Sequence, residues 1–219
     1  MNFLAIDSAG SILSVAVSRN EEIFYYETDS GMKQSELVMD IIGAQMKNAS
    51  LKPDDLNASF CMGGPGSFTG LRIGYSIAKG LSLALSIPFA PVPTLECVSY
   101  GIKGLALAVI EARKNAWFYA FFRDGMRVTN DNDGDYNQIA QEINKYNEKI
   151  ILTGYGSDML YNLLPENLRT DIILNFLKKG YAKELITIAK LRNLLDNDNT
   201  PNLYSGPEYK RLTDAELGK

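Results

Sequence analysis

The first half of the chain alternates short apolar runs, bounded by turn residues, with longer stretches in which apolar residues recur at helical spacing. Runs of the first kind are typical of buried strands, and stretches of the second kind are typical of helices packed on a sheet. In chain order they predict strands at 2–7, 12–18 and 21–27, a helix at about 33–49, a strand at 58–62 and a helix at about 69–86. The resulting order, β-β-β-α-β-α, is that of an RNase H-like unit.

The second half of the chain repeats this order. It predicts strands at about 107–113, 115–123, 126–130 and 150–153, with a helix near 136–147. Two matched halves indicate a duplicated fold, with chance similarity between two strand–helix turns as the alternative. We therefore expect an α/β protein of two RNase H-like halves, the second degenerate, with domains at 1–102 and 103–219.

Two offsets relate the halves. A shift of 104 residues places Glu111 on Asp7, so that each half has a strand ending near an acid. A shift of 90 residues places the glycines at 154 and 156 on Gly64 and Gly66.

Composition removes several classes of catalytic site. The 219 residues include no histidine, which excludes a Ser-His-Asp triad, a Cys-His dyad and every His-ligated metal site. Catalysis through Asp, Glu, Lys, Tyr or Cys stays open. The two cysteines, Cys61 and Cys97, make no disulfide framework. We expect no catalytic residue and no metal site in this chain.

Charge and hydropathy bear on partners and location. The net charge of −4 gives no overall attraction to phosphate backbones, so tight binding of tRNA by the chain alone is not expected. The N-terminus lacks the basic start of a signal peptide, and no apolar run approaches the roughly 20 residues that span a bilayer. These features predict a cytoplasmic protein without a membrane partner.

A glycine-rich segment at 63–70 joins a predicted strand to the helix at 69–86. Its glycines permit positive φ and close backbone approach, and the helix start offers N–H groups to an anion. It lacks the Gly-Lys-Ser/Thr ending of a P-loop. Ser67 or Thr69 is expected to cap the helix. We interpret the segment as a structural turn, with phosphate binding as the alternative.

The helices at 33–49 and 69–86 carry more apolar surface than one sheet can cover. Such a surplus favours a protein interface, although the two helices could also cover each other. Gly70, Gly74 and Ala78 recur every fourth residue, which would let a partner helix approach closely. The residues expected at the interface are Leu37, Ile41, Gly70, Gly74, Ile77, Ala78 and Leu81.

Taken in order, four segments resemble the TsaB (YeaZ) family. They are Gly-Pro-Gly-Ser-Phe-Thr-Gly-Leu-Arg-Ile-Gly at 64–74, the opening at 4–9, Ile-Glu-Ala-Arg at 110–113 with Trp-Phe-Tyr at 117–119, and Pro-Glu-Tyr-Lys-Arg at 207–211. Three positions depart from the family pattern. Gly10 stands where Thr is common, Glu111 where Asp is usual, and Gln34 where His is frequent.

The resemblance implies an actin-like ATPase or sugar-kinase type of fold and a non-catalytic role. Proteins of this family pair with a TsaD-like transferase, which carries a His-ligated metal and forms N6-threonylcarbamoyladenosine (t6A) beside the anticodon of tRNAs that read codons beginning with adenine. A TsaE-like ATPase joins the pair. The isolated chain is expected as a monomer or a homodimer.

The resemblance also bears on cofactors. In actin-like kinases an acid at the end of the first strand holds Mg²⁺, which makes Asp7 and Ser8 the candidates for a nucleotide site. The simpler interpretation is a carboxylate that caps its own turn. We expect no cofactor in this chain, with ATP and Mg²⁺ only at the level of the complex. An actin-like ATPase or small-molecule kinase is the alternative function.

Overall fold

The computed structural model describes residues 1–31, 33–113, 115–195, 206 and 207. The first half comprises β1 (Asn2–Asp7), β2 (Ile12–Arg19), β3 (Glu22–Asp29), α1 (Gln34–Asn48), a 3-10 turn (Pro53–Asp55), β4 (Ala58–Gly64), α2 (Phe68–Leu85), β5 (Phe89–Pro93) and α3 (Thr94–Ser99). The second half comprises β6 (Leu105–Arg113), β7 (Ala116–Arg123), β8 (Met126–Arg127), β9 (Asn132–Asp135), α4 (Tyr136–Ile143), β10 (Ile150–Tyr155), α5 (Ser157–Leu163), α6 (Glu166–Arg169), β11 (Ile172–Asn175) and α7 (Ala182–Leu191).

The two halves form two sheets with the same strand arrangement. The first sheet has the order β3-β2-β1-β4-β5, and the second β11-β10-β6-β7-β8 with β9 also paired to β7. In each, a central strand pairs antiparallel with the next strand and parallel with the strand that follows a helix. This common topology confirms the expected α/β fold of two RNase H-like halves.

The second half departs from the pattern in one detail. The residues before α4 are polar, as is typical of a loop, yet Asn132–Asp135 form β9 and pair with the start of β7. Their polar sequence has low strand propensity. They form a strand because the neighbouring aromatic strand, β7, has a free edge. On that edge β8 pairs only with Phe122 and Arg123, so the rest of β7 can pair with β9.

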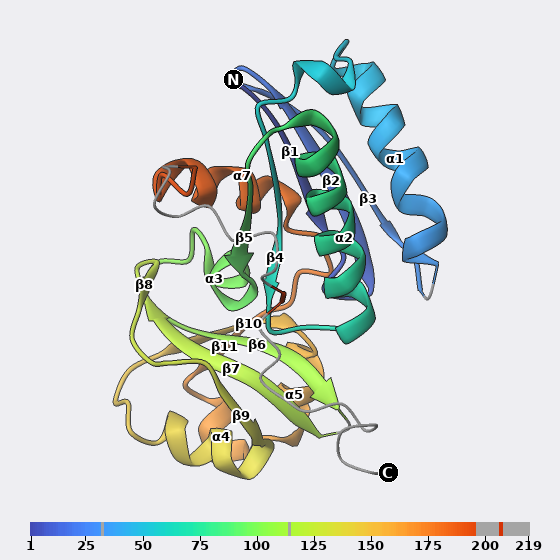
Figure 1. Cartoon of the computed structure of the whole chain (residues 1–219). Helices are drawn as coiled ribbons and strands as arrows, with labels where there is room; N and C mark the ends of the chain where they lie inside the picture. The colour runs from blue at the N-terminus through green and yellow to red at the C-terminus, as the bar shows by residue number, and fades with distance from the viewer. Residues whose placement is uncertain (32, 114, 196–205, 208–219) are drawn as a thin grey trace.

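Five layers follow from this topology. Helices α1 and α2 lie side by side on the outer face of the first sheet, and α4 and α5 cover the outer face of the second (Figure 1). Helices α3 and α7 lie between the sheets, in one continuous apolar core built from both halves. None of the helices in the described part of the chain has the length and apolarity that crossing a bilayer requires.

The two helices between the sheets pack across the domain boundary that was expected between residues 102 and 103. Helix α7 comes late in the sequence, yet it contacts β1, β2 and β4 of the first sheet. Helix α3 comes before the boundary and contacts β6 and β10 of the second sheet. The boundary therefore separates the two sheets, but α3 and α7 pack across it. Of the closing segment at 207–211 only Pro207 lies within the described residues.

The glycine–alanine row of α2 faces the interior of its own half. A Cβ on Gly70 would lie 1.8 Å from the Ser8 carbonyl oxygen, and a Cβ on Gly74 would lie 3.2 Å from the Ser8 Oγ. Ala78 is fully buried, and its carbonyl accepts a hydrogen bond of 3.3 Å from the Ser59 Oγ. The expectation that Gly70, Gly74 and Ala78 contact a partner is therefore wrong. The row lets α2 approach β1 and β4.

Gly70→Ala should destabilise the protein by about 1–3 kcal/mol, because the new methyl group would overlap the backbone after β1. Gly80→Ala, on the same helix, is the matched control. A Cβ there meets no atom of the described chain within 4 Å, so this change should stabilise by about 0.5–1 kcal/mol. Urea unfolding of both variants tests the assignment, and equal effects of the two changes would refute it.

Candidate functional site

The buried carboxylate of Asp7 joins three distant parts of the chain. Its Oδ1 accepts a hydrogen bond of 3.1 Å from the Ala9 amide. Its Oδ2 accepts one of 2.9 Å from the Tyr155 hydroxyl and one of 2.8 Å from the Tyr181 amide. Tyr155 ends β10 in the second half, and Tyr181 precedes α7. One side chain thus ties the first sheet to the second half and to the central helix.

Burial also sets the protonation of this group. Removal from water raises the pKa of Asp7 to about 6 from the usual 3.8, although its hydrogen bonds to Tyr181, Ala9 and Tyr155 act in the opposite direction. The nearby Glu184 raises it slightly further. The carboxyl is therefore mostly ionised at neutral pH, and it holds that charge in an environment that disfavours it.

Tyr155 fills the space beside Asp7. A Cβ on Gly10 would lie 2.6–2.8 Å from atoms of the Tyr155 ring, so the ring packs directly on this glycine. The ring also meets Tyr181 edge to face, with centroids 5.6 Å apart. The glycine found where Thr is common in the family thus makes room for the tyrosine. The cleft beside the candidate nucleotide residue is occupied by a side chain of the same molecule.

Ser8 and the glycine-rich segment are engaged with each other. The Ser8 Oγ donates a hydrogen bond of 2.7 Å to the Gly70 carbonyl, and the Ser67 amide donates one of 2.9 Å to the Ala9 carbonyl. The Ser67 Oγ caps α2 by accepting a hydrogen bond of 3.2 Å from the Gly70 amide. The predicted cap is confirmed at Ser67. These contacts support the interpretation of the segment as a structural turn.

A second group of contacts fixes the start of α7 on the first sheet. The Gly180 amide donates a hydrogen bond of 2.7 Å to Glu27, and the Gly180 carbonyl accepts one of 3.0 Å from Tyr25. The Ala182 amide donates one of 3.1 Å to the Ser14 Oγ. Sequence patterns had not singled out this segment. Its contacts join residues more than 150 positions apart in the sequence. They are made by backbone groups, which every residue carries, so no residue type in the sequence indicates them.

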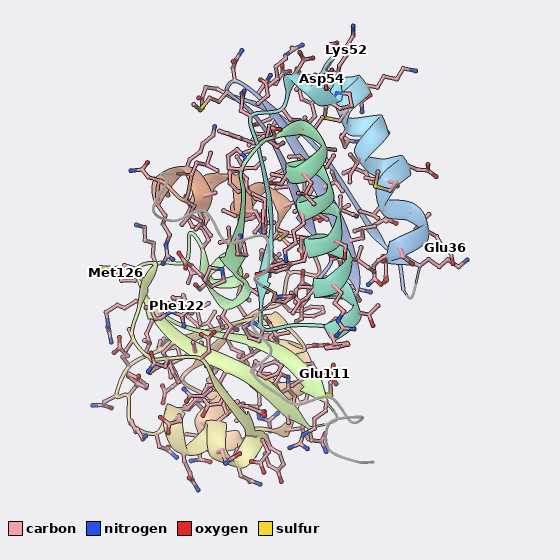
Figure 2. The ribbon with its side chains drawn as sticks, viewed as in Figure 1. Glu36, Lys52, Asp54, Glu111, Phe122 and Met126 are labelled. Carbon is pink, nitrogen blue, oxygen red and sulfur yellow. The ribbon has the colours of Figure 1, made fainter. Side chains whose placement is uncertain are left out.

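Tyr155 is the most important site residue that the sequence analysis did not identify, because it contacts both Asp7 and Gly10. It stands between two glycines, and the 90-residue shift aligns it with Pro65 of the first half. The difference between the two aligned residues, proline in the first half and tyrosine in the second, was the sequence feature that could have pointed to Tyr155. Glu111, the counterpart of Asp7, lies near the end of β6 with an exposed side chain (Figure 2). Partial burial and the neighbouring Asp158 raise its pKa.

Metal binding gains no support from the described residues. Within them, no group of three or more Cys, Asp or Glu side chains is placed to hold a metal ion. The two carboxylate oxygens of Asp7 accept hydrogen bonds from three protein donors. The two candidate nucleotide residues, Asp7 and Ser8, therefore lie in a site that the chain itself fills.

The outer face of α1 and α2 holds a groove of about 440 Å³. It is lined by Ser35, Val38 and Met39 of α1 and by Phe68, Thr69, Arg72, Ile73, Ser76 and Ile77 of α2. Met39 is 56% exposed, which is high for a large apolar side chain. Of the expected interface residues, Ile77 lines the groove. Leu37, Ile41 and Leu81 are half-buried on the core beneath the helices.

Comparison with known proteins places the chain. A family model described as "TsaD: tRNA N6-adenosine threonylcarbamoyltransferase" matches residues 29–153, more than half of the chain. The TsaB protein of Bacillus subtilis (strain 168) is 24% identical over 99% of this chain and 96% of its own length. That of Escherichia coli (strain K12) is 30% identical over 56% of this chain and 55% of its own. The chain belongs to the TsaB (YeaZ) family.

Solved structures agree with membership in the TsaB (YeaZ) family at the level of the fold. YeaZ from Pseudomonas aeruginosa superposes with a TM-score of 0.77 at 18% identity, covering 95% of this chain and 99% of that one. A second structure from Pseudomonas aeruginosa, described as similar to peptidase YEAZ, gives a TM-score of 0.81 at 17% identity and covers 96% and 99%. The family resemblance expected from the motifs is confirmed.

The raised pKa of Asp7 predicts a specific pH dependence of stability. The pKa is higher in the folded chain than the usual 3.8, so the folded state binds the proton more tightly than the unfolded state. The stabilisation from that proton is complete below about pH 4 and is lost as the pH rises through about 6. A pKa difference of roughly 2 corresponds to about 3 kcal/mol.

The Asp7→Asn variant isolates this effect, because it retains every other titrating group. The free energy of unfolding of the wild type, minus that of Asp7→Asn, should fall by about 3 kcal/mol between about pH 4 and pH 8. Urea unfolding of both proteins across this range measures the difference. Parallel pH profiles would show that Asp7 titrates alike in the folded and unfolded states.

Proposed function

We propose that this chain is a non-catalytic accessory subunit of tRNA threonylcarbamoyladenosine biosynthesis, which binds a TsaD-like transferase and activates it for t6A formation. The observation that carries the proposal is the match with Bacillus subtilis TsaB along nearly the full length of both chains. The name of that protein, tRNA threonylcarbamoyladenosine biosynthesis protein TsaB, states the biosynthetic process. The further statement, that the chain acts through a transferase partner, rests on the arguments below.

The composition argues that the chemistry belongs to another subunit. The matching family model is named for a transferase, and the sequence contains no histidine with which to build a His-ligated metal site. Cys61 and Cys97 are fully buried, and burial raises the pKa of both thiols, so neither is an activated nucleophile. The net charge of −4 also argues against tight tRNA binding by the chain alone.

The groove between α1 and α2 is the surface best suited to the partner. It presents Met39 and Ile77 beside polar residues at its rim, which is the composition of a protein interface. The chain covers the opposite face of both helices with its own sheet. We place the TsaD-like subunit on this groove, packed through helices of its own. A TsaE-like ATPase would join the assembled pair, and a homodimer of the isolated chain would use the same face.

Ser76→Arg tests this placement without disturbing the core. Ser76 is exposed on α2 and lines the groove, and arginine favours helix more than serine does. A charge without a partner in a buried interface should weaken association with a purified TsaD-like protein at least about 100-fold. Calorimetric titration gives the dissociation constant, and a thermal melt confirms that the variant is folded.

Gln141→Arg is the matched control. It adds the same charge at an exposed position of α4, on the other half of the molecule. It should bind the TsaD-like protein as the wild type does. A folded Ser76→Arg variant that binds with unchanged affinity would remove the groove from the interface. Wild-type chain that binds no TsaD-like protein would refute the proposed function itself.

The closed cleft argues against the alternative of an actin-like ATPase or kinase. The Tyr155 hydroxyl and the Tyr181 amide donate to the Asp7 Oδ2 and the Ala9 amide donates to Oδ1, so both oxygens to which a Mg²⁺–nucleotide would bind already accept hydrogen bonds. The purified chain should therefore bind Mg²⁺–ATP with a dissociation constant weaker than about 1 mM. Calorimetric titration with Mg²⁺–ATP measures this directly. Stoichiometric binding at micromolar concentration, or steady hydrolysis, would favour the ATPase instead.

A further inference from the structure

A cavity of about 560 Å³ lies where the two halves of the chain are joined, and it shares no lining residue with the α1–α2 groove. Its walls come from α3, from the linker that follows α3, from the turn between β7 and β8, and from the end of α7. Figure 2 labels Met126 in this turn, at the edge of the second sheet next to α3. Spaces between two domains are frequent positions for ligand sites, and the groups that line them determine the class of ligand.

The charged side chains that line this cavity differ in number and in accessibility. Three are basic and two are acidic, namely Lys103, Arg127 and Arg192 against Glu96 and Asp124. The Asp124 carboxylate accepts a hydrogen bond of 2.9 Å from a backbone amide of the linker. Glu96 is only 7% exposed, and its Oε2 is buried. The charge that the cavity presents to a ligand is therefore mainly positive.

Buried acids hold two of the basic groups in place. Glu96 forms an ion pair of 2.7 Å with Arg192, and Asp131 forms one with Arg127. The arginine side chain is the more exposed partner each time, at 47% against 10% in the first pair and 29% against 9% in the second. A guanidinium group carries five N–H donors, and each ion pair joins only one of its terminal nitrogens to the acid. The acids thus orient both arginines and leave donors for a ligand.

The two guanidinium groups reach the same part of the cavity from different elements. Burial raises the pKa of Glu96, and the charges of Arg192 and Arg127 both lower it, so both lie within electrostatic reach of this one carboxylate. Arg192 follows the last turn of α7, and Arg127 belongs to β8. Lys103 adds a third, exposed cation from the linker. Donors that converge from three segments suit an anion with several oxygens.

Large apolar side chains form the rest of the lining. Met126 is 72% exposed, Leu191 is 69% exposed and Tyr100 is 39% exposed, and all three line the cavity. Ligand pockets typically combine apolar walls that cover the body of the ligand with a few polar groups that orient it. This lining therefore suits an anionic group that is attached to an apolar body.

We propose that this cavity binds a small phosphate monoester with an apolar body. The phosphate oxygens accept hydrogen bonds from Lys103, Arg127 and Arg192, and Met126 and Leu191 cover the body. A monoester fits better than a carboxylate, because it offers three acceptor oxygens and a charge of roughly −1.5 to −2 at neutral pH. Arginine forks match phosphate geometry well. This inference is independent of the proposed function.

The probe is n-hexyl phosphate, titrated into the full-length chain. Proton–carbon NMR spectra of labelled methionine and isoleucine methyl groups report binding at Met126 and Ile188, which both line the cavity. Both signals should shift in a saturable way, and the signal of Met39, which lines the α1–α2 groove, should stay unchanged.

Three related compounds separate the contributions of charge, oxygen number and apolar body. n-Hexanol lacks the anion and inorganic phosphate lacks the body, so each should bind at least about tenfold more weakly than hexyl phosphate. n-Hexanoate has one oxygen fewer to accept from the three basic groups, and it should bind at least about threefold more weakly.

Two variants test the basic groups, and a third is their control. Lys103→Gln removes an exposed cation that forms no ion pair within the described part of the chain, so it should weaken hexyl phosphate binding at least about fivefold without lowering the melting temperature. Arg192→Lys keeps a charge beside Glu96 but loses the planar fork, and it should weaken binding at least about threefold. Lys52→Gln removes the same charge at an exposed position far from Met126 (Figure 2) and should bind as the wild type does.

Four results would overturn the proposal. They are no saturable shift of Met126 and Ile188 in the wild type, equal affinity for hexyl phosphate and either hexanol or hexanoate, unchanged binding by folded Lys103→Gln, and equal weakening by Lys52→Gln. Displacement of hexyl phosphate by a short RNA without terminal phosphates would also contradict it, because the basic groups would then bind phosphodiesters. Should Arg192→Lys fail to fold, Lys103→Gln decides the question. None of these measurements involves a TsaD-like protein, so their outcome is separate from that of the proposed function.

Discussion

The fold depends on the hydrogen bonds of one buried carboxylate. Asp7 ends the first strand in the interior of the molecule, and a charge in that position is tolerated only with several donors. The donors are the Ala9 amide, the Tyr155 hydroxyl and the Tyr181 amide. Satisfying Asp7 therefore brings the second half and α7 against the first sheet. The same contacts place the Tyr155 ring on Gly10 and fill the cleft.

This closure supports the proposed function, in which the actin-like architecture would be kept without actin-like chemistry. The Asp7 oxygens that would face a nucleotide accept hydrogen bonds that join the halves, and the outer face of α1 and α2 holds a groove beside the exposed Met39. The row of Gly70, Gly74 and Ala78, which was expected to contact a partner helix, instead packs inside the first half of the chain. Gly70 lets the turn at Ser8 pass under α2, and the groove beside it stays open.

The strands and helices of residues 2–86 and the duplication could be predicted from the sequence, because apolar spacing is local and reflects the burial of each element separately. The helix cap at Ser67 was predictable for the same reason. Periodicity cannot say which neighbour covers an apolar helix face, and so the row of Gly70, Gly74 and Ala78 was assigned to the wrong contact. Tyr155 was missed because its partner lies 148 residues away. A single sequence carries no local mark of such a pairing.

A double-mutant cycle of Asp7→Asn and Tyr155→Phe tests this account most directly. Asp7→Asn replaces the charged acceptor of the 2.9 Å hydrogen bond between the halves by a neutral amide, Tyr155→Phe removes its donor, and both leave the side-chain volume nearly unchanged. Urea unfolding at neutral pH gives the four free energies of unfolding. The account predicts a coupling energy of at least about 1 kcal/mol, as expected for a buried hydrogen bond to a charged group. Additive effects of the two changes would show that Tyr155 does not hold the cleft closed through Asp7.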